Sequence, residues 1–232
     1  MKDDGSRDVL DPVLRDISSA RNYNGWLFDR ARPYLGRDVL DVGAGIGTFT
    51  RLAADAGAFV TAVDPEFATA LRARFAGDLR VQVVEGAADD VPSDRRFDSI
   101  LCFNVLEHIE EHEAMLRSLS QRLRPGGRLL LLVPAHAYLY GGFDRAAGHV
   151  RRYDKPTLHK LLQRADLVVE DVRHVNPVGA LGWLVRMRTR RTPDWPSSSF
   201  HVFDRLVPLL RPLDRLRLPC GLSLWAVARR PA

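Results

Sequence analysis

The chain of 232 residues is poor in cysteine and has no long hydrophobic run. Cys102 and Cys220 are isolated and lack CxxC or CxxH spacing, which argues against a zinc site and against a disulfide framework. The longest aliphatic run, Leu129 to Val133, is far shorter than the roughly twenty residues that span a bilayer. The polar amino terminus lacks the apolar segment of a signal peptide. We therefore expect a soluble, cytoplasmic protein.

Internal repeats and low-complexity tracts are also missing. With ordinary apolar content and charges of both signs, a chain of this length can bury one substantial core. We expect a single domain over residues 1–232, with a helical cap at 1–36, a core at 37–174, a helical insert at 175–220 and a last strand at 221–232. The cap is expected to act as a lid, and the insert to form a wall of the substrate pocket.

The positive charge belongs to the carboxyl-terminal quarter. Residues 175–232 contain ten arginines against three aspartates, which exceeds the net charge of +5 of the whole chain. Such a patch can meet nucleic acid, anionic lipid or a phosphorylated substrate, although a solvated arginine face is the commoner explanation. The patch is compatible with a peripheral membrane contact or a lipid-linked substrate and requires neither.

From Arg37 onward, short aliphatic runs alternate with amphipathic segments, as in parallel strands joined by crossover helices. The expected strands are 38–41, 59–63, 81–85, 97–102, 127–133, 167–174 and 222–227, and the expected helices are 48–56, 66–75, 110–123 and 155–165. This pattern predicts an α/β fold with an open, doubly wound, seven-stranded sheet. Ligands bind such sheets outside the carboxyl ends of the strands, so we expect the site after the first four strands.

The segment VLDVGAGIGTFT, Val39 to Thr50, has glycine at positions 43, 45 and 47. A glycine-rich turn between a strand and a helix brings bare backbone and the helix amino terminus close to a ligand. Thr48 stands where the dinucleotide fingerprint GxGxxG needs its third glycine. Asp41, just before the loop, would repel a pyrophosphate but suits a cationic ligand. The loop therefore favours a nucleoside ligand other than a dinucleotide, with an NAD-dependent oxidoreductase as the competing interpretation.

Asp64 ends the second strand, 21 residues after Gly43. A carboxylate at this position accepts hydrogen bonds from both ribose hydroxyls. It can also cap a helix that begins after Pro65 and Glu66. The two roles are compatible, and we expect Asp64 to bind ribose.

Four segments together resemble the successive motifs of the class I S-adenosylmethionine-dependent methyltransferases, of type 11/12 and close to the ubiquinone-pathway group. They are VLDVGAGIGTFT, AVDPE, FDSILCFNVLEHI and LRPGGRLLLLVP, in the usual order and spacing from Arg37 to Pro134. The resemblance implies a Rossmann-like sheet of seven strands, mostly parallel with an antiparallel last strand, and helices on both faces. It also implies S-adenosylmethionine as cofactor and S-adenosylhomocysteine as product.

In this family the glycine loop holds the methionine part of the cofactor, the acid after the second strand holds the ribose, and the segment after the third strand faces the adenine. Many members have aspartate where this chain has Ala87, so the backbone amides of Ala87 and Ala88, or else the carboxylate of Asp89, would serve instead. The resemblance thus implies cofactor contacts at Asp41, Gly43, Gly45, Gly47, Asp64, Pro65, Ala87, Ala88, Asn104, Val105, Leu106 and His108, with residues 104–106 on the methyl side.

Glu107 and His108 are expected to begin the helix after the fourth strand. The resemblance puts His108 near the cofactor, while the residues alone fit a glutamate at a helix amino terminus and a capping histidine. His108 and His112 are four apart, as two metal ligands on one helical face would be, but Ile109 stands where the HExxH motif has glutamate. We therefore expect no metal.

The connection between residues 134 and 154 is long and dense in polar groups, and such a loop in a compact domain is commonly functional. It resembles a stretch of the form LYG…D…GHxRRY in a group of bacterial methyltransferases. We predict His149 as first choice and His136 as second choice for a general base. Alternatively, Asp144 and the arginines form ion pairs that hold the loop. The residues predicted to contact the substrate are Tyr138, Tyr140, Arg151, Arg152 and Tyr153.

The sequence predicts a methyltransferase that acts on a small molecule, with oxygen first and nitrogen or carbon next as the acceptor atom. An RNA-directed methyltransferase is the second interpretation, but the run Asn/Asp-Pro-Pro-Tyr/Phe of base-amine methyltransferases is replaced by Asn104-Val105-Leu106-Glu107. A binding protein without catalysis is the third, although the glycine loop and the ribose acid are intact. Nucleic acid is thus a disfavoured partner, and the oligomeric state is left open.

Overall fold

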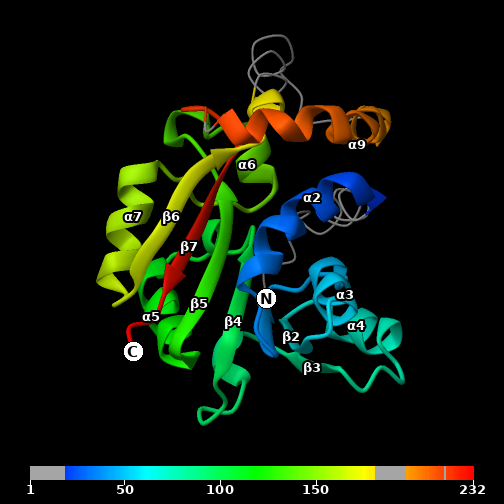
Figure 1. Cartoon of the computed structure of the whole chain (residues 1–232), viewed down its shortest axis with the longest axis vertical. Helices are drawn as coiled ribbons and strands as arrows, with labels where there is room; N and C mark the ends of the chain where they lie inside the picture. The colour runs from blue at the N-terminus through cyan, green and yellow to red at the C-terminus, as the bar shows by residue number, and fades with distance from the viewer. Residues whose placement is uncertain (1–18, 181–196, 217) are drawn as a thin grey trace.

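The structure is a computed structural model that describes residues 19–180, 197–216 and 218–232. Its seven strands form one sheet in the order β3-β2-β1-β4-β5-β7-β6 (Figure 1). Strands β1 to β5 pair in parallel, and β7 lies antiparallel between β5 and β6. The strands are β1 (Asp38–Val42), β2 (Phe59–Asp64), β3 (Val81–Glu85), β4 (Phe97–Phe103), β5 (Leu123–Pro134), β6 (Val168–Val175) and β7 (Ser223–Arg229). The expected doubly wound, mostly parallel sheet with an antiparallel last strand is confirmed.

The helices begin and end near the expected residues, with two differences. The α-helices are α2 (Arg21–Ala31), α3 (Thr48–Asp55), α4 (Ala68–Arg74), α5 (His112–Arg122), α6 (Gly142–Ala146), α7 (Lys155–Arg164) and α9 (Ser197–Leu210). Helices α4 and α5 each start two residues later than expected, because backbone hydrogen bonds to Asp64 and a 3-10 turn at Leu106–His108 occupy the residues before them. The expected helices within 1–18 and 181–196 lie outside the described residues.

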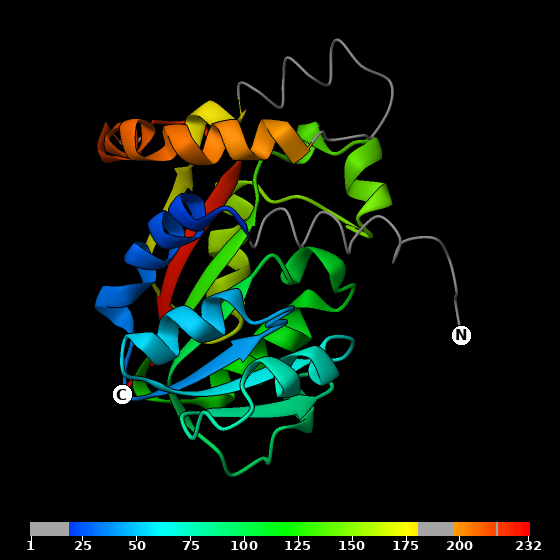
Figure 2. The ribbon, with the colours of Figure 1, turned by 90° about the vertical axis from the view of Figure 1, so that its right-hand side faces the viewer.

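The two faces of the sheet are covered by different helices. One apolar cluster joins α5 and α7 to the sheet, and the other joins α2 and α3 to its opposite face (Figures 1 and 2). Strand β4 contributes side chains to both clusters, because Ile100 and Cys102 belong to the first and Leu101 and Phe103 to the second. This alternation is the period of two of a strand that is buried on both faces. Helices on both faces were expected from the resemblance.

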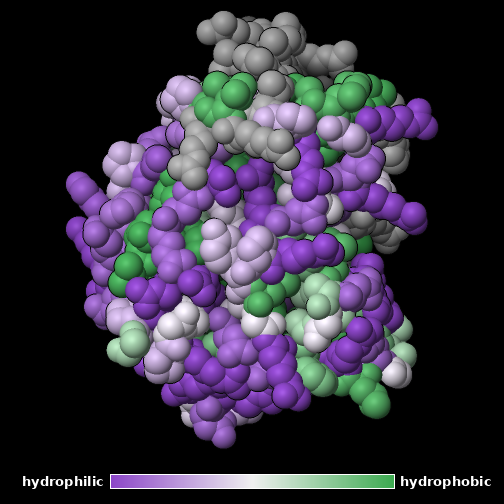
Figure 3. Space-filling model, viewed as in Figure 1, coloured by the Kyte–Doolittle hydropathy of each residue, from purple (hydrophilic) through white to green (hydrophobic). Residues whose placement is uncertain are grey.

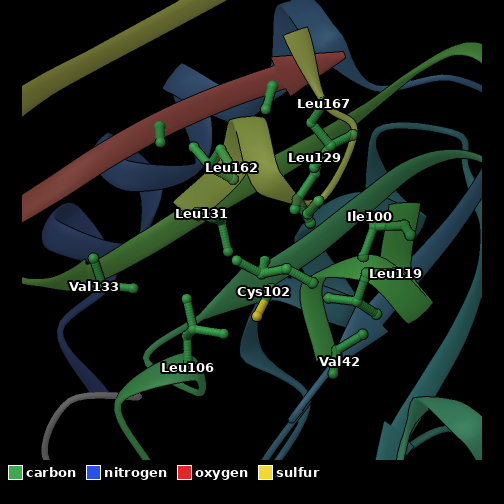
Figure 4. Packing of buried hydrophobic residues seen from close by; sticks show 14 of the residues in the cluster. Val42, Ile100, Cys102, Leu106, Leu119, Leu129, Leu131, Val133, Leu162 and Leu167 are labelled. Atoms are coloured by element: carbon green, nitrogen blue, oxygen red, sulfur yellow. The ribbon is translucent and has the colours of Figure 1, made fainter. Parts of the chain in front are cut away.

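Cys102 lies in the middle of the first cluster, between the sheet and the residues that follow β4. Figure 4 shows it close to Leu106 and Leu131, and all three side chains are fully buried. Burial of each leucine stabilises the fold by about 1.5–3 kcal/mol relative to an exposed side chain. Cys102 and Cys220 are both free, as expected. Burial strongly raises the pKa of the Cys102 thiol, which keeps it protonated.

Helix α9 lies across the end of α2, near the edge where β5 and β6 end (Figures 1 and 2). The carboxylate of Asp204 accepts a hydrogen bond from the backbone N–H of Tyr23 at 2.8 Å and one from the side chain of Asn22 at 3.3 Å. Arg211 pairs with Asp29 at 2.9 Å. The insert therefore caps the first turn of α2 with a side chain from far along the chain. Among the described residues, no helix combines the length and the apolar character needed to cross a membrane.

We expect the substitution Asp204→Ala to lower the free energy of unfolding by about 1–2 kcal/mol, because the Tyr23 N–H loses its capping acceptor. Urea unfolding followed by the fluorescence of Trp26, which lies in α2, measures the change. Asp204→Asn is the matched control, since its amide oxygen can still accept this bond, and it should retain at least half of the lost stability. An Asp204→Ala variant as stable as the parent would show that the cap contributes nothing.

Candidate functional site

The loop between β1 and α3 exposes backbone only at its middle. A side chain at Gly43 would collide with Val105, and one at Gly47 would collide with Phe75. A Cβ at Gly45 would meet no atom within 4 Å, so this residue borders open space. Its φ of +54° lies in the left-handed region that glycine adopts readily. The outer glycines thus permit close packing, and Gly45 presents bare backbone to a ligand.

Asp64 ends β2 beside this bare backbone and is nearly fully buried. Its Oδ2 accepts a hydrogen bond from the N–H of Gly45 at 2.8 Å, and its Oδ1 accepts from the N–H groups of Glu66 and Phe67 at 2.9 and 2.8 Å. A carboxylate has about four acceptor positions, so capacity for a further donor remains at Oδ2. The capping role is therefore present in the structure, and the position is compatible with the predicted ribose contact. Pro65 is exposed next to it.

Asp41 is buried at the end of β1 and is paired with a hydroxyl, not with a cation. The hydroxyl of Thr50 donates to its Oδ2 at 2.6 Å. Burial raises the pKa of Asp41 to about 7, the bond from Thr50 opposes this shift, and the nearby charge of Asp64 adds to it. A cationic group placed here would favour the ionised carboxylate. The sequence did not single out Thr50, although its place in the first turn of α3, after the glycine loop, could have indicated it.

The segment after β3 carries both alternatives for adenine binding. The carboxylate of Asp89 accepts a hydrogen bond from Ser118 on α5, which turns it toward that helix. The N–H of Ala87 donates to Asp90 at 2.7 Å. Ala88 is buried at the start of a 3-10 turn. The Asp89 carboxylate and the Ala87 amide are thus both engaged within the chain, and the adenine contacts stay a prediction.

The residues after β4 divide between the site and the core. Asn104 is exposed and has a φ of 54°, a left-handed conformation that asparagine tolerates better than most residues. Val105 is half-buried against Gly43. The side chain of Leu106 is fully buried in the core (Figure 4), so a contact with the cofactor at this position would come from its backbone.

Glu107 and His108 do not begin a helix, which corrects the sequence prediction. They lie in the 3-10 turn Leu106–His108, and α5 begins at His112. Glu107 is fully buried, and neither of its carboxylate oxygens has a hydrogen-bond partner among the described residues. Burial raises the pKa of Glu107 to about 8, and the backbone of the residue itself opposes this shift more than the charge of Arg152 does. Sequence reasoning placed Glu107 at a helix amino terminus, with His108 as the capping residue, and so missed an acid that is buried inside the fold.

His149, the first choice for a base, is held by a buried ion pair. Its Nδ1 lies 2.9 Å from Oδ1 of Asp144, and the Nε of Arg152 lies 2.8 Å from the same oxygen. Burial alone would raise the pKa of Asp144, but the hydrogen bonds from His149 and Arg152 lower it below its usual value. Since an ionised carboxylate only accepts, Nδ1 of His149 donates, and in the neutral ring the lone pair lies on Nε2.

The ring of His149 meets that of His108 edge-on, with 4.8 Å between the ring centroids. Burial and the neighbouring His149 lower the pKa of His108 to about 4, so this imidazole is neutral at pH 7. The loop reaches the turn through one backbone bond, from the N–H of Val150 to the carbonyl of Glu107 at 2.8 Å. The structure thus brings together two histidines, a glutamate and an ion pair that are distant in sequence.

The other residues predicted to contact the substrate differ in their burial and in their hydrogen-bond partners. Tyr153 is fully buried, and its hydroxyl donates to the carbonyl of Leu106 at 3.0 Å. Arg152 is buried in the ion pair with Asp144. These positions stabilise the loop, as the alternative interpretation held, and they differ from the predicted substrate contacts. Arg151 donates to the carbonyl of Glu110.

Two tyrosines of the loop lie nearer to the surface. Tyr140 donates its hydroxyl to the carbonyl of His149 at 2.9 Å, while Tyr138 is 74% exposed. This bond links Tyr140 to the backbone of His149 and so stabilises the loop.

His136, the second choice for a base, belongs to another cluster. Its ring stacks on that of His174 with a centroid distance of 4.9 Å and lies 5.3 Å from the ring of Tyr138. Its φ of 64° is unusual for histidine and follows directly after the end of β5. The structure therefore does not join the two predicted bases in one group.

The sequences of known proteins also identify this chain as similar to methyltransferases. A family model described as a methyltransferase domain matches residues 14–172. The chain is 33% identical over 184 residues to a ubiquinone biosynthesis O-methyltransferase of Xanthomonas oryzae pv. oryzae, a match that covers 71% of this chain and 72% of the relative.

Among solved structures, similar folds bind the expected cofactor or its product. The 1,6-didemethyltoxoflavin-N1-methyltransferase of Burkholderia thailandensis, with S-adenosylhomocysteine bound, matches with a TM-score of 0.61 and 23% identity over 98% of this chain and 84% of that chain. The phosphoethanolamine N-methyltransferase 2 of Haemonchus contortus, with S-adenosyl-L-methionine bound, matches with a TM-score of 0.62 and 17% identity over 91% of this chain and 53% of that chain. With the glycine loop and Asp64 in place, the chain belongs to the methyltransferase-domain family and is an S-adenosylmethionine-dependent methyltransferase.

Proposed function

We propose that the chain transfers a methyl group to a hydroxyl oxygen of a small-molecule acceptor. The observation that carries this proposal is the hydrogen bond between His149 and Asp144 beside the end of β4, at 2.9 Å. A hydroxyl keeps its proton near pH 7, so its methylation gains from a base that is already oriented. The name of the relative at 33% identity, an O-methyltransferase, supports oxygen as the acceptor atom. Nitrogen and carbon are the alternatives.

The proposed chemistry divides between the two halves of the site. When bound, the cofactor supplies a methyl carbon that is activated by a positively charged sulfur. Asp64 accepts hydrogen bonds from the ribose, the bare backbone at Gly45 borders the methionine part, and Asp41 attracts its ammonium group. His149 takes the hydroxyl proton at Nε2, while Asp144 holds the imidazole by Nδ1 and stabilises its charged form, as the acid of a Ser-His-Asp triad does.

The proposed acceptor carries an apolar portion. Three apolar residues of α9 are exposed at helical spacing, Val202 at 58%, Leu206 at 44% and Leu209 at 76%. Figure 3 shows hydrophobic residues gathered on the surface over this helix. An acceptor with a hydrocarbon tail fits such a surface, and the relatives named for ubiquinone biosynthesis support this choice. Nucleic acid stays a disfavoured partner.

The direct test incubates the purified protein with S-adenosylmethionine carrying an isotopically labelled methyl group and, in parallel, a cell extract or a phenol with an alkyl chain. Mass spectrometry should find the label in a methyl ether. His149→Ala should lower kcat by at least about 100-fold, in the range of general-base catalysis. His159→Ala, on the outer part of α7, serves as the matched control and should retain full activity. Label found on nitrogen or carbon alone would contradict the choice of oxygen.

Asp64→Ala should weaken the binding of S-adenosylhomocysteine by about 1–3 kcal/mol, because it removes a charged acceptor of the ribose hydroxyls. Isothermal titration calorimetry measures the difference. Asp55→Ala, an exposed carboxylate on α3, is the control and should bind like the parent. Equal affinity of the Asp64→Ala variant would remove Asp64 from the site, and tight binding of NAD without binding of S-adenosylhomocysteine would contradict the proposed cofactor.

The raised pKa of Asp41, about 7, predicts a pH dependence of cofactor affinity. Only the ionised carboxylate attracts the ammonium group, so the dissociation constant of S-adenosylhomocysteine should fall by about tenfold between pH 6 and pH 8. In the free protein the same group lowers the free energy of unfolding as pH rises from its ordinary pKa of 3.8 towards 7, since the folded state holds the proton more tightly.

Calorimetry at several pH values, together with thermal unfolding, checks both effects of Asp41. The variant Asp41→Asn keeps the shape of the side chain and should flatten both profiles. A parent protein whose affinity does not change between pH 6 and pH 8 would show that Asp41 does not face the ammonium group.

A further inference from the structure

The crossover from β3 to β4 lacks the α-helix that usually covers the face of a parallel sheet. Residues 86–96 all belong to the described part of the chain, and their helical content is the 3-10 turn Ala88–Asp90. The crossovers before and after this one contain the helices α4 and α5. A crossover helix normally buries the strands that it connects, so its absence here leaves part of the sheet open.

The open part lies on the face of β2 and β3 that is turned away from α3 and α4. Those two helices pack on the side of Val60 and Ala62. Thr61 and Gln82 are partners in the register and point to the opposite face, because successive side chains of a strand alternate. A groove of about 410 Å³ lies over them, and Thr61 is 3% exposed at its floor. Small-molecule sites occupy about 300–1,000 Å³, so the groove is large enough for a ligand.

Arginine and apolar side chains line this groove together. The arginines are Arg37, Arg80 and Arg95, and the apolar residues are Phe59 and Leu79. The guanidinium of Arg37 lies over the ring of Phe59, 5.2 Å from its centroid. Leu79 is 96% exposed and Phe59 is 44% exposed, so apolar surface faces solvent beside the three cations.

The acids near the groove already have cationic partners. Asp38, which lines the groove, is paired with Arg124 at 2.8 Å. Asp78 is paired with Arg80 at 3.2 Å and with Arg51 at 2.9 Å. These two carboxylates therefore have little capacity to neutralise a further arginine.

Arg37 and Arg95 keep a charge that no acid compensates within the described residues, where neither guanidinium belongs to an ion pair. Their contacts are with aromatic rings, that of Arg37 with Phe59 and that of Arg95 with Phe97 at 5.7 Å. A cation–π contact uses the face of the guanidinium and leaves its N–H donors for other partners. Paired N–H donors match the oxygens of a phosphate, and two guanidiniums suit the double charge of a phosphate monoester.

We propose that this groove binds a small organic phosphate that carries an apolar ring. Arg37 and Arg95 donate hydrogen bonds to the phosphate oxygens. The ring of the ligand packs on Leu79 and Phe59, and the side-chain amide of Gln82 offers a donor and an acceptor at the floor. Apolar surface next to paired guanidiniums gives the groove a preference for such a ligand over inorganic phosphate.

The groove and the cofactor site lie at opposite ends of the same strands. Asp38 and Phe59 are partners at the start of β1 and β2, whereas Asp41 and Asp64 lie at the other end. At about 3.3 Å per residue, these short strands separate the two ligands by roughly 15 Å. Both sites can therefore be occupied together, and binding at the groove does not depend on the methyl acceptor proposed above.

The test titrates tag-free protein with phenyl phosphate by isothermal titration calorimetry, with and without saturating S-adenosylhomocysteine. We expect one equivalent to bind in both cases, and the affinity to fall as the salt concentration rises. Inorganic phosphate and benzyl alcohol, which each carry one half of the probe, should bind at least about tenfold more weakly than phenyl phosphate.

Arg37→Met and Arg95→Met should each weaken the binding of phenyl phosphate by at least about tenfold, because each removes charged donors to the phosphate. Arg96→Met is the matched control, since it removes the same charge from the next residue, whose guanidinium donates to the carbonyl of Ser93. This control should bind phenyl phosphate like the parent.

Leu79→Ser tests the apolar side of the groove and is expected to fold, because this side chain is almost fully exposed. It should weaken the binding of phenyl phosphate and leave that of inorganic phosphate unchanged. Circular dichroism shows whether each variant is folded, and Leu79→Ser keeps the test valid if an arginine variant does not fold.

Three results would overturn the groove as a ligand site. They are absence of binding at millimolar phenyl phosphate, equal weakening by Arg95→Met and Arg96→Met, and loss of binding when S-adenosylhomocysteine is present. The last result would place the probe in the cofactor site. The assay with labelled S-adenosylmethionine tests the proposed methyl transfer separately from all three.

Discussion

The parallel pairing of β1 with β2 on one side and β4 on the other is the constraint on which the site depends. The register sets Asp41 of β1 opposite Ala62 of β2 and Leu101 of β4, so the three strands end within a few residues of one another. Their carboxyl ends then deliver the glycine loop, Asp64 and the turn at Glu107 to one edge. None of these groups needs its own scaffold, because the hydrogen bonds of the sheet already fix their relative positions.

Four acidic residues are buried at or near this edge. Asp64 accepts three backbone hydrogen bonds, and the other three acids differ in how the fold compensates them. Asp144 is compensated by Arg152 and His149, and its pKa is lowered. Asp41 is bonded by the hydroxyl of Thr50 and, more weakly, by its backbone, and burial raises its pKa to about 7. Glu107 receives no hydrogen bond to its oxygens from the described residues, and its pKa rises to about 8. A carboxylate without a partner is costly in a low-dielectric interior, so the least compensated acids mark the places where the protein gains most from a ligand.

The sheet and the cofactor half of the site could be predicted because their signals are local. A strand, a glycine loop and an acid at the next strand end lie within 30 residues, and β3 was placed at its observed residues, Val81–Glu85. The arrangement of the acceptor half could not be predicted, since 42 positions separate Glu107 from His149 and the contacts between the two segments, such as those from Val150 to Glu107 and from Tyr153 to Leu106, form only in the fold. Helical spacing does not apply to His108 and His112, because a 3-10 turn that ends before α5 begins lies between them.

The cofactor half of the site lies on the sheet and the acceptor half lies on a loop, and this separation explains how one fold can methylate unlike acceptors. The relatives in structure include an N-methyltransferase named for phosphoethanolamine and one named for 1,6-didemethyltoxoflavin, each below 25% identity to this chain. Cofactor contacts come from residues next to paired strands, and a change there disturbs the sheet. The loop after β5 is attached by hydrogen bonds from Val150 to Glu107 and from Tyr153 to Leu106, and it is held internally by the ion pair of Asp144 with Arg152. Such a segment can change its sequence while the strands keep their register, so acceptor chemistry can vary on a constant cofactor site.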